Sequence, residues 1–344
     1  MNQSSSPRPG DRALRKRQVE LLSLAEGFFE SRILFALKRL NIFDVLGEEE
    51  RTAAEVAESI GAERPFLDRL LNAGVMLRLL EKSDAGRYRV APQLRPLLVE
   101  AGGPAYLGDW LDLLQMLDDA MRSLHVAAVE GGPTVQGHAE RDPEELRAFT
   151  MAMHSYAALR GRELARFLDT SECETLLDLG CGPGTYSCHI GLANPGLRLV
   201  LIDHPQVLET TREIHGRYPL KNDIEYVPLD ITEGEIPGSY DLVLVSNTLH
   251  MLGETASREL LSRVRRHVNP GGSLVVQFQY MDEDRLGGRW AVILDLIQMC
   301  YTSHGKNHTV DETREWMESA GFADVEFCSM SLLNTNGFLR GYVG

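Results

Sequence analysis

The apolar and polar positions of the first hundred residues predict helices followed by a hairpin. Apolar residues recur at helical spacing between residues 22 and 40. The sequence at residues 52–55 has the spacing of a capping box, which predicts a second helix, and a third is expected from about Pro65. Short runs over residues 79–82 and 87–90 flank an Asp-Ala-Gly turn, a pattern typical of a hairpin.

Helix, turn, helix and hairpin together predict a mainly helical winged-helix domain over residues 15–100. The polar residues 1–14 before it are expected to form a disordered tail. Residues 101–172 are predicted to form a helical linking segment, because apolar positions at 110–117 and 144–167 again follow helical spacing.

Strands and helices alternate over residues 173–344. This alternation predicts a Rossmann-like α/β domain with a doubly wound, mostly parallel sheet of seven strands. The last two strands are separated only by a loop and are therefore expected to be antiparallel neighbours. The predicted strands cover residues 175–178, 197–202, 224–228, 241–245, 273–279, 325–328 and 338–343, and the predicted helices cover residues 205–218, 254–268, 290–301 and 310–320.

The turn after the first of these strands is rich in glycine. It reads Asp178-x-Gly180-x-Gly182-x-Gly184 and precedes a helix-compatible stretch. Glycines let the backbone approach a ligand closely, and the start of a helix offers free N–H groups. A dinucleotide-binding turn would need its third glycine at Thr185, and a P-loop would need a Gly-Lys-Ser/Thr ending. The sequence has neither, which leaves another nucleotide-like ligand or a tight turn that binds nothing.

Two further strands also end in acidic residues. Asp203 follows the second strand, about 20 residues past the glycines, where a carboxylate can accept hydrogen bonds from a ribose diol. Asp230 and Ile231 follow the third strand, where an acid can bind an adenine amino group. Ligands of open α/β sheets bind beyond the carboxyl ends of the strands. The three acids therefore favour a ligand that contains ribose and adenine.

The composition favours a soluble enzyme. The chain carries 50 acidic and 35 basic residues, a formal charge of −15, which predicts no broad attraction to nucleic acid or to an anionic membrane. No apolar run is long enough to span a membrane, and the N-terminus lacks the apolar region of a signal peptide. The 5 cysteines fit no metal-ligand spacing, so reduced thiols in the cytoplasm are expected.

With these motifs the chain resembles the class I S-adenosylmethionine-dependent methyltransferases. More narrowly, it is similar to the two-domain small-molecule O-methyltransferases that carry an N-terminal winged-helix dimerisation domain. The resemblance covers about residues 15–344, and the family usually has leucine where this chain has His204. It is carried by residues 178–184, Asp203-His-Pro205, Asp230-Ile231, Ser246-Asn-Thr-Leu-His250, Asn269-Pro-Gly-Gly272 and Ala320-Gly-Phe322.

The resemblance implies S-adenosylmethionine as cofactor, a small aromatic or natural-product-like acceptor, and a homodimer formed through the N-terminal domain. O-methylation is expected because it is the family's usual reaction. The residues expected to bind the cofactor are Asp178, Gly180, Gly182, Asp203, Asp230, Ile231 and Ser246. Those expected to contact the acceptor are Met153, Tyr156, Trp290 and Leu294 by the resemblance, Gln279 by its place at a strand end, and His308 as a polar anchor. The apolar and aromatic ones could equally be ordinary core.

His250 is the candidate general base. It follows the fourth strand, at the edge of the sheet where ligands bind, and imidazole titrates in the range useful for taking a proton from a phenol. It also matches the catalytic histidine of the family. The alternative is a histidine whose hydrogen bonds are satisfied by the backbone at the strand end.

The residues expected near His250 depart from the family's pattern. The plant-type phenol O-methyltransferases have Asp-Trp after this histidine and two glutamates beside it. Here Met251 and Leu252 replace the Asp-Trp pair, and Phe278 and Asn307 occupy the glutamate positions. The lost carboxylates leave open C- or N-methylation of another acceptor, or a catalytically silent subunit that still binds the cofactor.

Two more alternatives remain. A metal-assisted reaction could use His250, His304 and His308, but these histidines lack a defined short spacing and no metal site is predicted. A winged-helix regulator that senses a nucleotide is the alternative from another class. DNA binding needs a clustered basic face, and bases exceed acids only slightly between residues 51 and 95. Dimerisation is therefore the preferred role for the first domain.

Overall fold

The computed structural model describes residues 9–99, 103, 105–135, 142–330 and 336–344. The chain divides into two compact units, Met1–Asp112 and Leu113–Gly344. The first unit extends past the expected boundary at residue 100. Its Lys38 ammonium lies 3.2 Å from a carboxylate oxygen of Asp112 and also hydrogen-bonds to Tyr106, which ties this later segment to the first unit.

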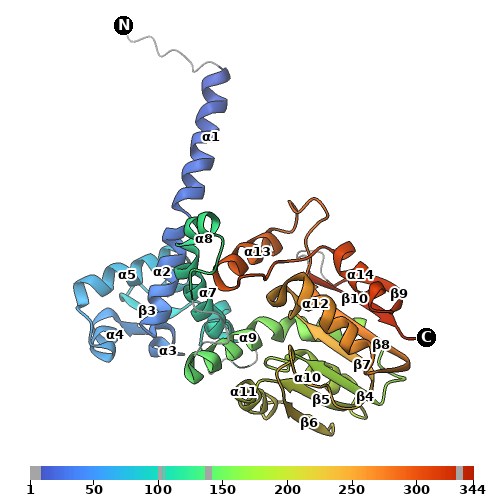
Figure 1. Ribbon diagram of the computed structural model, residues 1–344. Coiled ribbons are helices and arrows are strands. Elements are labelled where there is room, and N and C mark those ends of the chain that lie inside the picture. Colours follow the sequence, from blue (N-terminus) through green and yellow to red (C-terminus); the bar gives the residue numbers. More distant parts are fainter. Residues whose placement is uncertain (1–8, 100–102, 104, 136–141, 331–335) are drawn as a thin grey trace. The chain divides into compact units, whose positions relative to one another are not determined.

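The first unit is mainly helical and contains one small sheet (Figure 1). Its elements are α1 (Pro9–Glu26), α2 (Phe28–Arg39), α3 (Ile42–Leu46), β1 (Arg51–Thr52), α4 (Ala53–Ile60), α5 (Arg64–Met76), β2 (Leu80–Lys82), β3 (Arg87–Val90), η1 (Pro92–Leu94) and α6 (Arg95–Leu98). The predicted capping box begins α4, where the backbone N–H of Thr52 donates to Glu55 at 2.6 Å. β3 pairs antiparallel with both β1 and β2, which confirms the predicted hairpin.

The prediction of a disordered tail over residues 1–14 is wrong from Pro9 onward, where α1 begins. The sequence after Pro9 is rich in residues with high helix propensity, and Lys16 and Arg17 both pair with Glu20 one turn later. Residues 1–8 lie outside the described part of the chain.

A helical segment leads into the second unit, as predicted for residues 101–172. It consists of α7 (Gly108–Met121), α8 (Leu124–Glu130) and α9 (Pro143–Phe167). Asp142 caps α9, because one of its carboxylate oxygens accepts the backbone N–H groups of Glu144 and Glu145 at 2.9 Å each.

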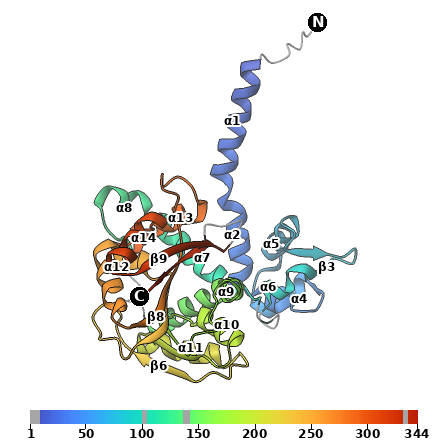
Figure 2. The ribbon, with the colours of Figure 1, turned by 90° about the vertical axis from the view of Figure 1, so that its right-hand side faces the viewer.

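A sheet of seven strands forms the centre of the second unit (Figure 2). The strands are β4 (Thr175–Leu179), β5 (Arg198–Asp203), β6 (Ile224–Pro228), β7 (Tyr240–Ser246), β8 (Val268–Gln279), β9 (Ala323–Ser329) and β10 (Asn336–Tyr342). Their spatial order is β6-β5-β4-β7-β8-β10-β9. The first five of these are parallel, and β10 pairs antiparallel with β8 and β9. The predicted doubly wound sheet and its antiparallel final pair are therefore confirmed.

Helices cover both faces of this sheet. Those that follow the strands are α10 (Thr185–Ala193), α11 (Pro205–His215), α12 (Leu249–Arg265), α13 (Arg289–Tyr301) and α14 (Val310–Ser319). Leu164 of α9 and Ile190 of α10 are buried in the core of one face, whereas Leu261 of α12 and Trp316 of α14 are buried in the core of the other. With both faces covered, the carboxyl ends of the parallel strands are the edge where a ligand can bind.

Candidate active site

The glycine turn between β4 and α10 has the backbone that only glycine adopts readily. Gly180, Gly182 and Gly184 have φ angles of +71°, +52° and +62°. A Cβ added at Gly184 would lie 2.6 Å from Nε2 of His215, whereas one added at Gly182 would meet nothing within 4 Å. The turn is therefore packed against His215 at Gly184 and unobstructed at Gly182, where a ligand can approach its backbone.

Asp203, at the end of β5, lies directly beside this turn. Its Oδ2 accepts the backbone N–H of Gly182 at 2.7 Å, and its Oδ1 accepts the N–H of His204 at 2.7 Å. Burial raises the pKa of Asp203, and the two backbone donors oppose this rise. Each carboxylate oxygen keeps a further lone pair, which can accept a hydrogen bond from a diol.

Asp178 is buried beneath the same turn and is only 1% exposed. Burial raises its pKa to about 7, a hydrogen bond from Ser187 opposes this, and the nearby Asp203 adds to it. Its Oδ1 has no hydrogen-bond partner among the described residues. A buried carboxylate oxygen without a donor is costly, so this site fits a ligand that brings a donor or a positive charge.

The third predicted acid lies further out. Asp230 is exposed, and its Oδ1 accepts hydrogen bonds from the backbone and hydroxyl of Thr232 at 2.8 and 2.6 Å. Ile231 reaches the glycine turn, because a Cβ added at Gly180 would lie 3.2 Å from its Cδ1. The same Cβ would lie 3.1 Å from the hydroxyl of Thr248, a residue that the sequence analysis did not single out.

Ser246 ends β7 but directs its side chain into the sheet. Its hydroxyl donates to Oε1 of Gln277 at 2.5 Å, and the amide of Asn247 donates to the same oxygen at 2.6 Å. Gln277 in turn donates to Asn336 of β10. Asn247 has a φ of +50°, a region that few residues other than glycine adopt. This network joins three strands and supports the turn that leads to α12.

His250 lies in the first turn of α12 and is partly exposed. It comes four residues after β7, and β7 pairs directly with β4, the strand that carries the glycine turn. The candidate base and the candidate cofactor turn therefore lie at the carboxyl ends of neighbouring strands, where the order of the sheet reverses.

Three of the residues expected to contact the acceptor come together. The amide of Gln279 on β8 donates to the hydroxyl of Tyr156 on α9 at 2.8 Å. Burial raises the pKa of that hydroxyl, and the positive charge of Arg160 and a hydrogen bond donated by the indole of Trp290 on α13 oppose the rise. Met153 and Leu294 lie on the same two helices as Tyr156 and Trp290, and both are half-buried. These side chains come from α9, from the end of β8 and from α13, the helix that follows β8.

His308 is not part of this group. It is 2% exposed, its ring lies 4.5 Å from the ring of Trp316 in an edge-on contact, and its Nε2 lies 3.4 Å from the carbonyl of Leu249. Burial lowers its pKa to about 4. The side chain thus packs in the interior between α12 and α14, and we leave it out of the proposed acceptor site. Within the described ranges, His, Cys, Asp and Glu form no group of three or more that could hold a metal ion.

Phe278 and Asn307, the two positions where the resemblance led us to expect glutamate, serve packing here. Phe278 is 5% exposed and belongs to the same apolar core as Trp316. Asn307 is 1% exposed, and its amide donates to the carbonyl of Ala291 at 3.0 Å. A hydrogen bond at 2.6 Å joins the backbone N–H of Asn307 to Asp295. Asn307 therefore fixes the segment after α13 to that helix.

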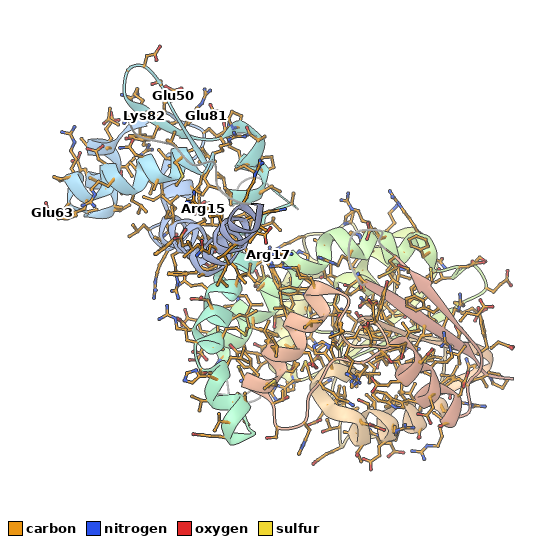
Figure 3. All side chains as sticks on the ribbon, turned by 90° about the horizontal axis from the view of Figure 1, so that it is seen from above. Arg15, Arg17, Glu50, Glu63, Glu81 and Lys82 are labelled. Atoms are coloured by element: carbon orange, nitrogen blue, oxygen red, sulfur yellow. The ribbon has the colours of Figure 1, made fainter. Side chains whose placement is uncertain are left out.

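The arginines of the hairpin strand β3 are paired with acids. Arg89 lies 2.7 Å from Glu81 and 3.3 Å from Glu50, and Arg87 lies 3.0 Å from Glu55. Figure 3 shows Glu50, Glu81 and Lys82 gathered at the hairpin. Because carboxylates neutralise the bases of the wing, this surface is a poor partner for phosphate, and the DNA-binding alternative is not favoured.

Comparison with known proteins agrees with this geometry. Residues 110–323 match the family described as O-methyltransferase domain, and residues 22–100 match the O-methyltransferase dimerisation domain. The tetracenomycin polyketide synthesis 8-O-methyl transferase TcmO of Streptomyces glaucescens is 27% identical over 91% of this chain and 93% of its own. The N,N-dimethyltransferase OxyT of Streptomyces rimosus is also 27% identical, over 88% and 90%.

The fold has solved counterparts as well. Human N-acetylserotonin methyltransferase in complex with S-adenosylmethionine superposes with a TM-score of 0.85 at 24% identity, and the match covers 100% of both chains. The sheet order, the glycine turn and the acids beside it define a Rossmann-like S-adenosylmethionine-dependent methyltransferase. The chain belongs to the O-methyltransferase family, with the dimerisation domain of that family at its N-terminal side. Among the described residues, no helix is both long and apolar enough to cross a membrane.

Proposed function

We propose that this enzyme transfers the methyl group of S-adenosylmethionine to a hydroxyl of a small aromatic, natural-product-like acceptor. The observation that carries the proposal is the position of His250 beside the glycine turn, at the ends of the paired strands β4 and β7. Relatives named for 8-O-methylation in polyketide synthesis and for 3-O-methylation of a hydroxynaphthoate support a fused aromatic acceptor.

The residues around the turn suit each part of the cofactor. We propose that Asp203 accepts hydrogen bonds from the ribose diol and that Asp230 and Ile231 contact the adenine. Gly180 and Gly182 allow close backbone approach, and the unpaired oxygen of Asp178 suits the positively charged end of the molecule. Ser246 acts through Gln277, which orients the backbone at the end of β7.

The cofactor, when bound, supplies a methyl group on a sulfonium that is already activated toward nucleophiles. The protein therefore has to align the acceptor oxygen, exclude water and remove one proton. We propose that His250 takes the hydroxyl proton as the oxygen–methyl bond forms and the sulfur–methyl bond breaks, with its electron pair left on sulfur. Tyr156, Gln279 and Trp290, with Met153 and Leu294, orient the ring of the acceptor.

N-methylation is the second candidate. The observation behind it is the match to an N,N-dimethyltransferase at 27% identity, although the matching family model is that of an O-methyltransferase domain and supports the first candidate. It is also consistent with Phe278 and Asn307 at the glutamate positions, because a neutral amine needs less help from carboxylates than a phenol does.

The first unit is proposed to form a homodimer. α1 and α2 expose Leu21, Leu24, Phe28 and Phe29 with 67%, 80%, 52% and 57% of their surfaces accessible. Large apolar side chains that follow one another in this way mark a surface for another protein. The match to the dimerisation domain supports a second copy as the partner. The five cysteines are free thiols, in keeping with a cytoplasmic location.

The test is an acceptor screen read by mass spectrometry. The purified enzyme is incubated with S-adenosylmethionine and matched hydroxyl and amine forms of naphthoates, tetracyclic polyketides and indoles. A mass gain of one methyl on hydroxyl forms only supports O-methylation, whereas gain on amine forms only supports the second candidate. Binding of S-adenosylhomocysteine is measured in parallel by calorimetry, and its absence would overturn both.

A further inference from the structure

The helix that carries His250 is broken one turn after it begins. Gly253 has φ +74° and ψ +174°, so the turn containing His250 is separated from the rest of α12. A Cβ added at Gly253 would lie 2.6 Å from the backbone carbonyl oxygen of His304. The segment after α13 therefore lies directly against the break, at a distance that only glycine allows.

The contact is reciprocal. A Cβ added at Gly305 would lie 2.7 Å from the backbone carbonyl oxygen of His250 and even closer to the hydroxyl of Thr302. The N–H of Gly305 donates to that same hydroxyl at 2.8 Å, which closes a tight turn. Two glycines from different elements thus let the turn with His250 and residues 302–305 lie backbone to backbone.

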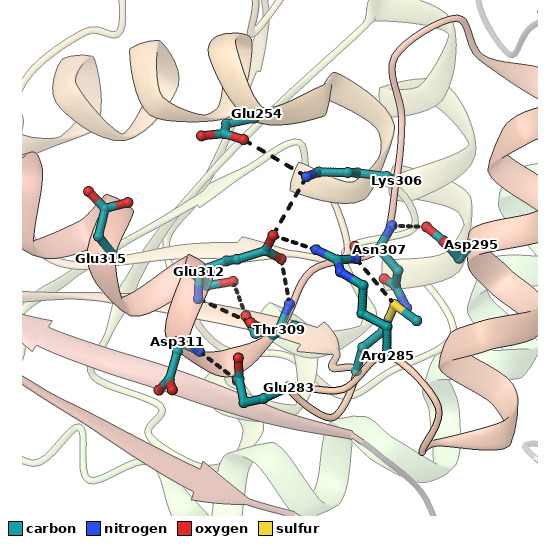
Figure 4. Close-up of polar contacts among 12 residues, drawn as sticks. Glu254, Glu283, Arg285, Asp295, Lys306, Asn307, Thr309, Asp311, Glu312 and Glu315 are labelled. Carbon is teal, nitrogen blue, oxygen red and sulfur yellow. Dashed lines mark hydrogen bonds and ion pairs between the residues drawn. The ribbon is translucent and has the colours of Figure 1, made fainter. Parts of the chain in front are cut away.

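Charged side chains hold the segment in place. Lys306 lies 3.8 Å from Glu254, just after the break, and 3.6 Å from Glu312 of α14 (Figure 4). Arg285 pairs with the same carboxylate of Glu312. The N–H of Asn307 is bound by Asp295 of α13, as described above. Residues 305–307 are therefore fastened to α12, α13 and α14.

We propose that Gly305 and Gly253 are positioning residues for His250. This rests on the proposed role of His250 as base. The first turn of α12 packs against residues 302–306 through backbone contacts. A methyl group added at either glycine would force the two backbones apart. A shift of about 1 Å at a reacting group can lower a rate about a hundredfold. This packing therefore affects kcat through the position of His250 and does not require contact with the cofactor.

The ion pairs of Lys306 assist this arrangement. Both are partly exposed and long, and pairs of that kind contribute little on their own. The close approach of the two backbones is therefore the larger determinant, and Lys306 reduces the freedom of the segment to move away.

The experiment compares Gly305→Ala with Gly196→Ala. Gly196 is a matched control, because an added Cβ there has only an ordinary contact at 3.7 Å. Gly305→Ala is expected to lower kcat at least tenfold with the phenolic acceptor that reacts best in the screen. The KM for S-adenosylmethionine and the Kd for S-adenosylhomocysteine should stay within twofold, and Gly196→Ala should match the parent enzyme.

A second-site variant separates the two contacts of Gly305. Thr302→Ala in the Gly305→Ala background removes the clash with the hydroxyl but leaves the clash with the carbonyl of His250. We expect kcat to stay low. Recovery to the level of Thr302→Ala alone would overturn the proposal, because the fault would then lie in the turn and not at His250.

A measurement without acceptor completes the test. The side-chain NMR signal of His250 in the complex with S-adenosylhomocysteine is identified by its loss in His250→Gln. It should shift in Gly305→Ala, and to a smaller extent in Lys306→Met, with recovery in Lys306→Arg. If Gly305→Ala does not fold, the Thr302→Ala, Gly305→Ala double variant, which has one clash fewer, is measured in its place, and an unmoved signal there overturns the proposal.

The outcomes also distinguish the role of His250 as base from the positioning role of Gly305. If His250→Gln keeps full activity, the base assignment fails and this proposal fails with it. If His250→Gln is slow and Gly305→Ala is fast, only the positioning role is overturned.

Discussion

The backbone N–H of Gly182 donates a 2.7 Å hydrogen bond to the carboxylate of Asp203, 21 residues later in the chain. One acid therefore has two tasks at this edge of the sheet. It holds the backbone of the glycine turn, and its remaining lone pairs can accept hydrogen bonds from the ribose that is proposed to bind there. Loss of the carboxylate should affect both the shape of the turn and the contacts to the ligand.

Asp203→Ala should weaken binding of S-adenosylhomocysteine at least tenfold, or about 1.4 kcal/mol. Calorimetric titration measures the change. Asp223→Ala is the control, since Asp223 is an exposed acid near the same strands, and its carboxylate pairs with Arg198 at 3.4 Å. Equal affinity in Asp203→Ala and the parent enzyme would remove Asp203 from the cofactor site.

Binding of S-adenosylmethionine should depend on pH through Asp178. The pKa of this buried acid is about 7 without ligand, so it is mostly ionised above neutrality and mostly protonated below. A cationic ligand binds the ionised form better and therefore lowers this raised pKa. Affinity should therefore be full above pH 7 and fall by up to about tenfold for each unit below it. Calorimetry across this range should give a flat profile for Asp178→Asn; a flat profile for the parent enzyme would contradict the assignment.

The fold was predictable because its signals are local. Short stretches of sequence contain the glycines that form turns and the acids at strand ends. They also show where the spacing of apolar residues changes from that of a helix to that of a strand. Asp178 and Asp203 do meet at the glycine turn, and Asp230 lies further out, since parallel strands bring their carboxyl ends to one edge. The hairpin and the capping box of the first unit were predictable for the same reason.

Side-chain direction was not predictable in this way. His308 packs edge-on against Trp316 in a buried segment before α14, and its contact with the acceptor stays a prediction. Ser246 bonds to Gln277 on the next strand, a partner that its local sequence does not reveal, and its contact with the cofactor also stays a prediction. The break at Gly253 depends on residues about 50 positions later, and no local pattern reveals a contact across that separation.

His250→Gln should lower kcat by about a hundredfold or more with a phenolic acceptor, the usual contribution of a general base. Affinity for S-adenosylhomocysteine should not change, because the glycine turn is left intact. The loss should shrink with a dinitrophenol, which is already ionised at neutral pH and needs no base. Equal losses for both kinds of phenol would show that His250 orients the acceptor and does not take its proton.

Charge placed on α2 should separate the proposed dimer. Phe28 and Phe29 stack with their ring centroids 4.3 Å apart and are both more than half exposed. Phe28→Glu with Phe29→Glu would bury two carboxylates in an apolar interface, which is unfavourable. Light scattering after size exclusion should report a monomer. Phe66→Glu on α5 is the control, because Phe66 is 69% exposed but lies outside α1 and α2, and it should remain dimeric. A dimer in both variants would place the interface elsewhere.

Acid should destabilise the fold through His154. This side chain is 9% exposed, and its Nδ1 lies 2.8 Å from the hydroxyl of Thr185, at the start of α10. Burial lowers its pKa to about 4, and the nearby Arg217, His189 and His215 add to the effect. The unfolded chain, with a pKa near 6.5, therefore binds the proton more readily than the folded one. Stability is full above that value and declines as the pH falls toward 4.

The expected loss from His154 is about 2 kcal/mol in the free energy of unfolding between pH 7.5 and pH 5. Urea unfolding at both pH values, at one protein concentration, measures it. His154→Gln keeps a polar side chain next to Thr185 but cannot take up the proton, so its stability should change less over the same interval. His308, whose pKa is also about 4, remains in that variant and accounts for part of the residual change. If the variant and the parent enzyme lost equal stability, the proton would be taken up elsewhere, and His154 would have to be accessible to water in the folded state.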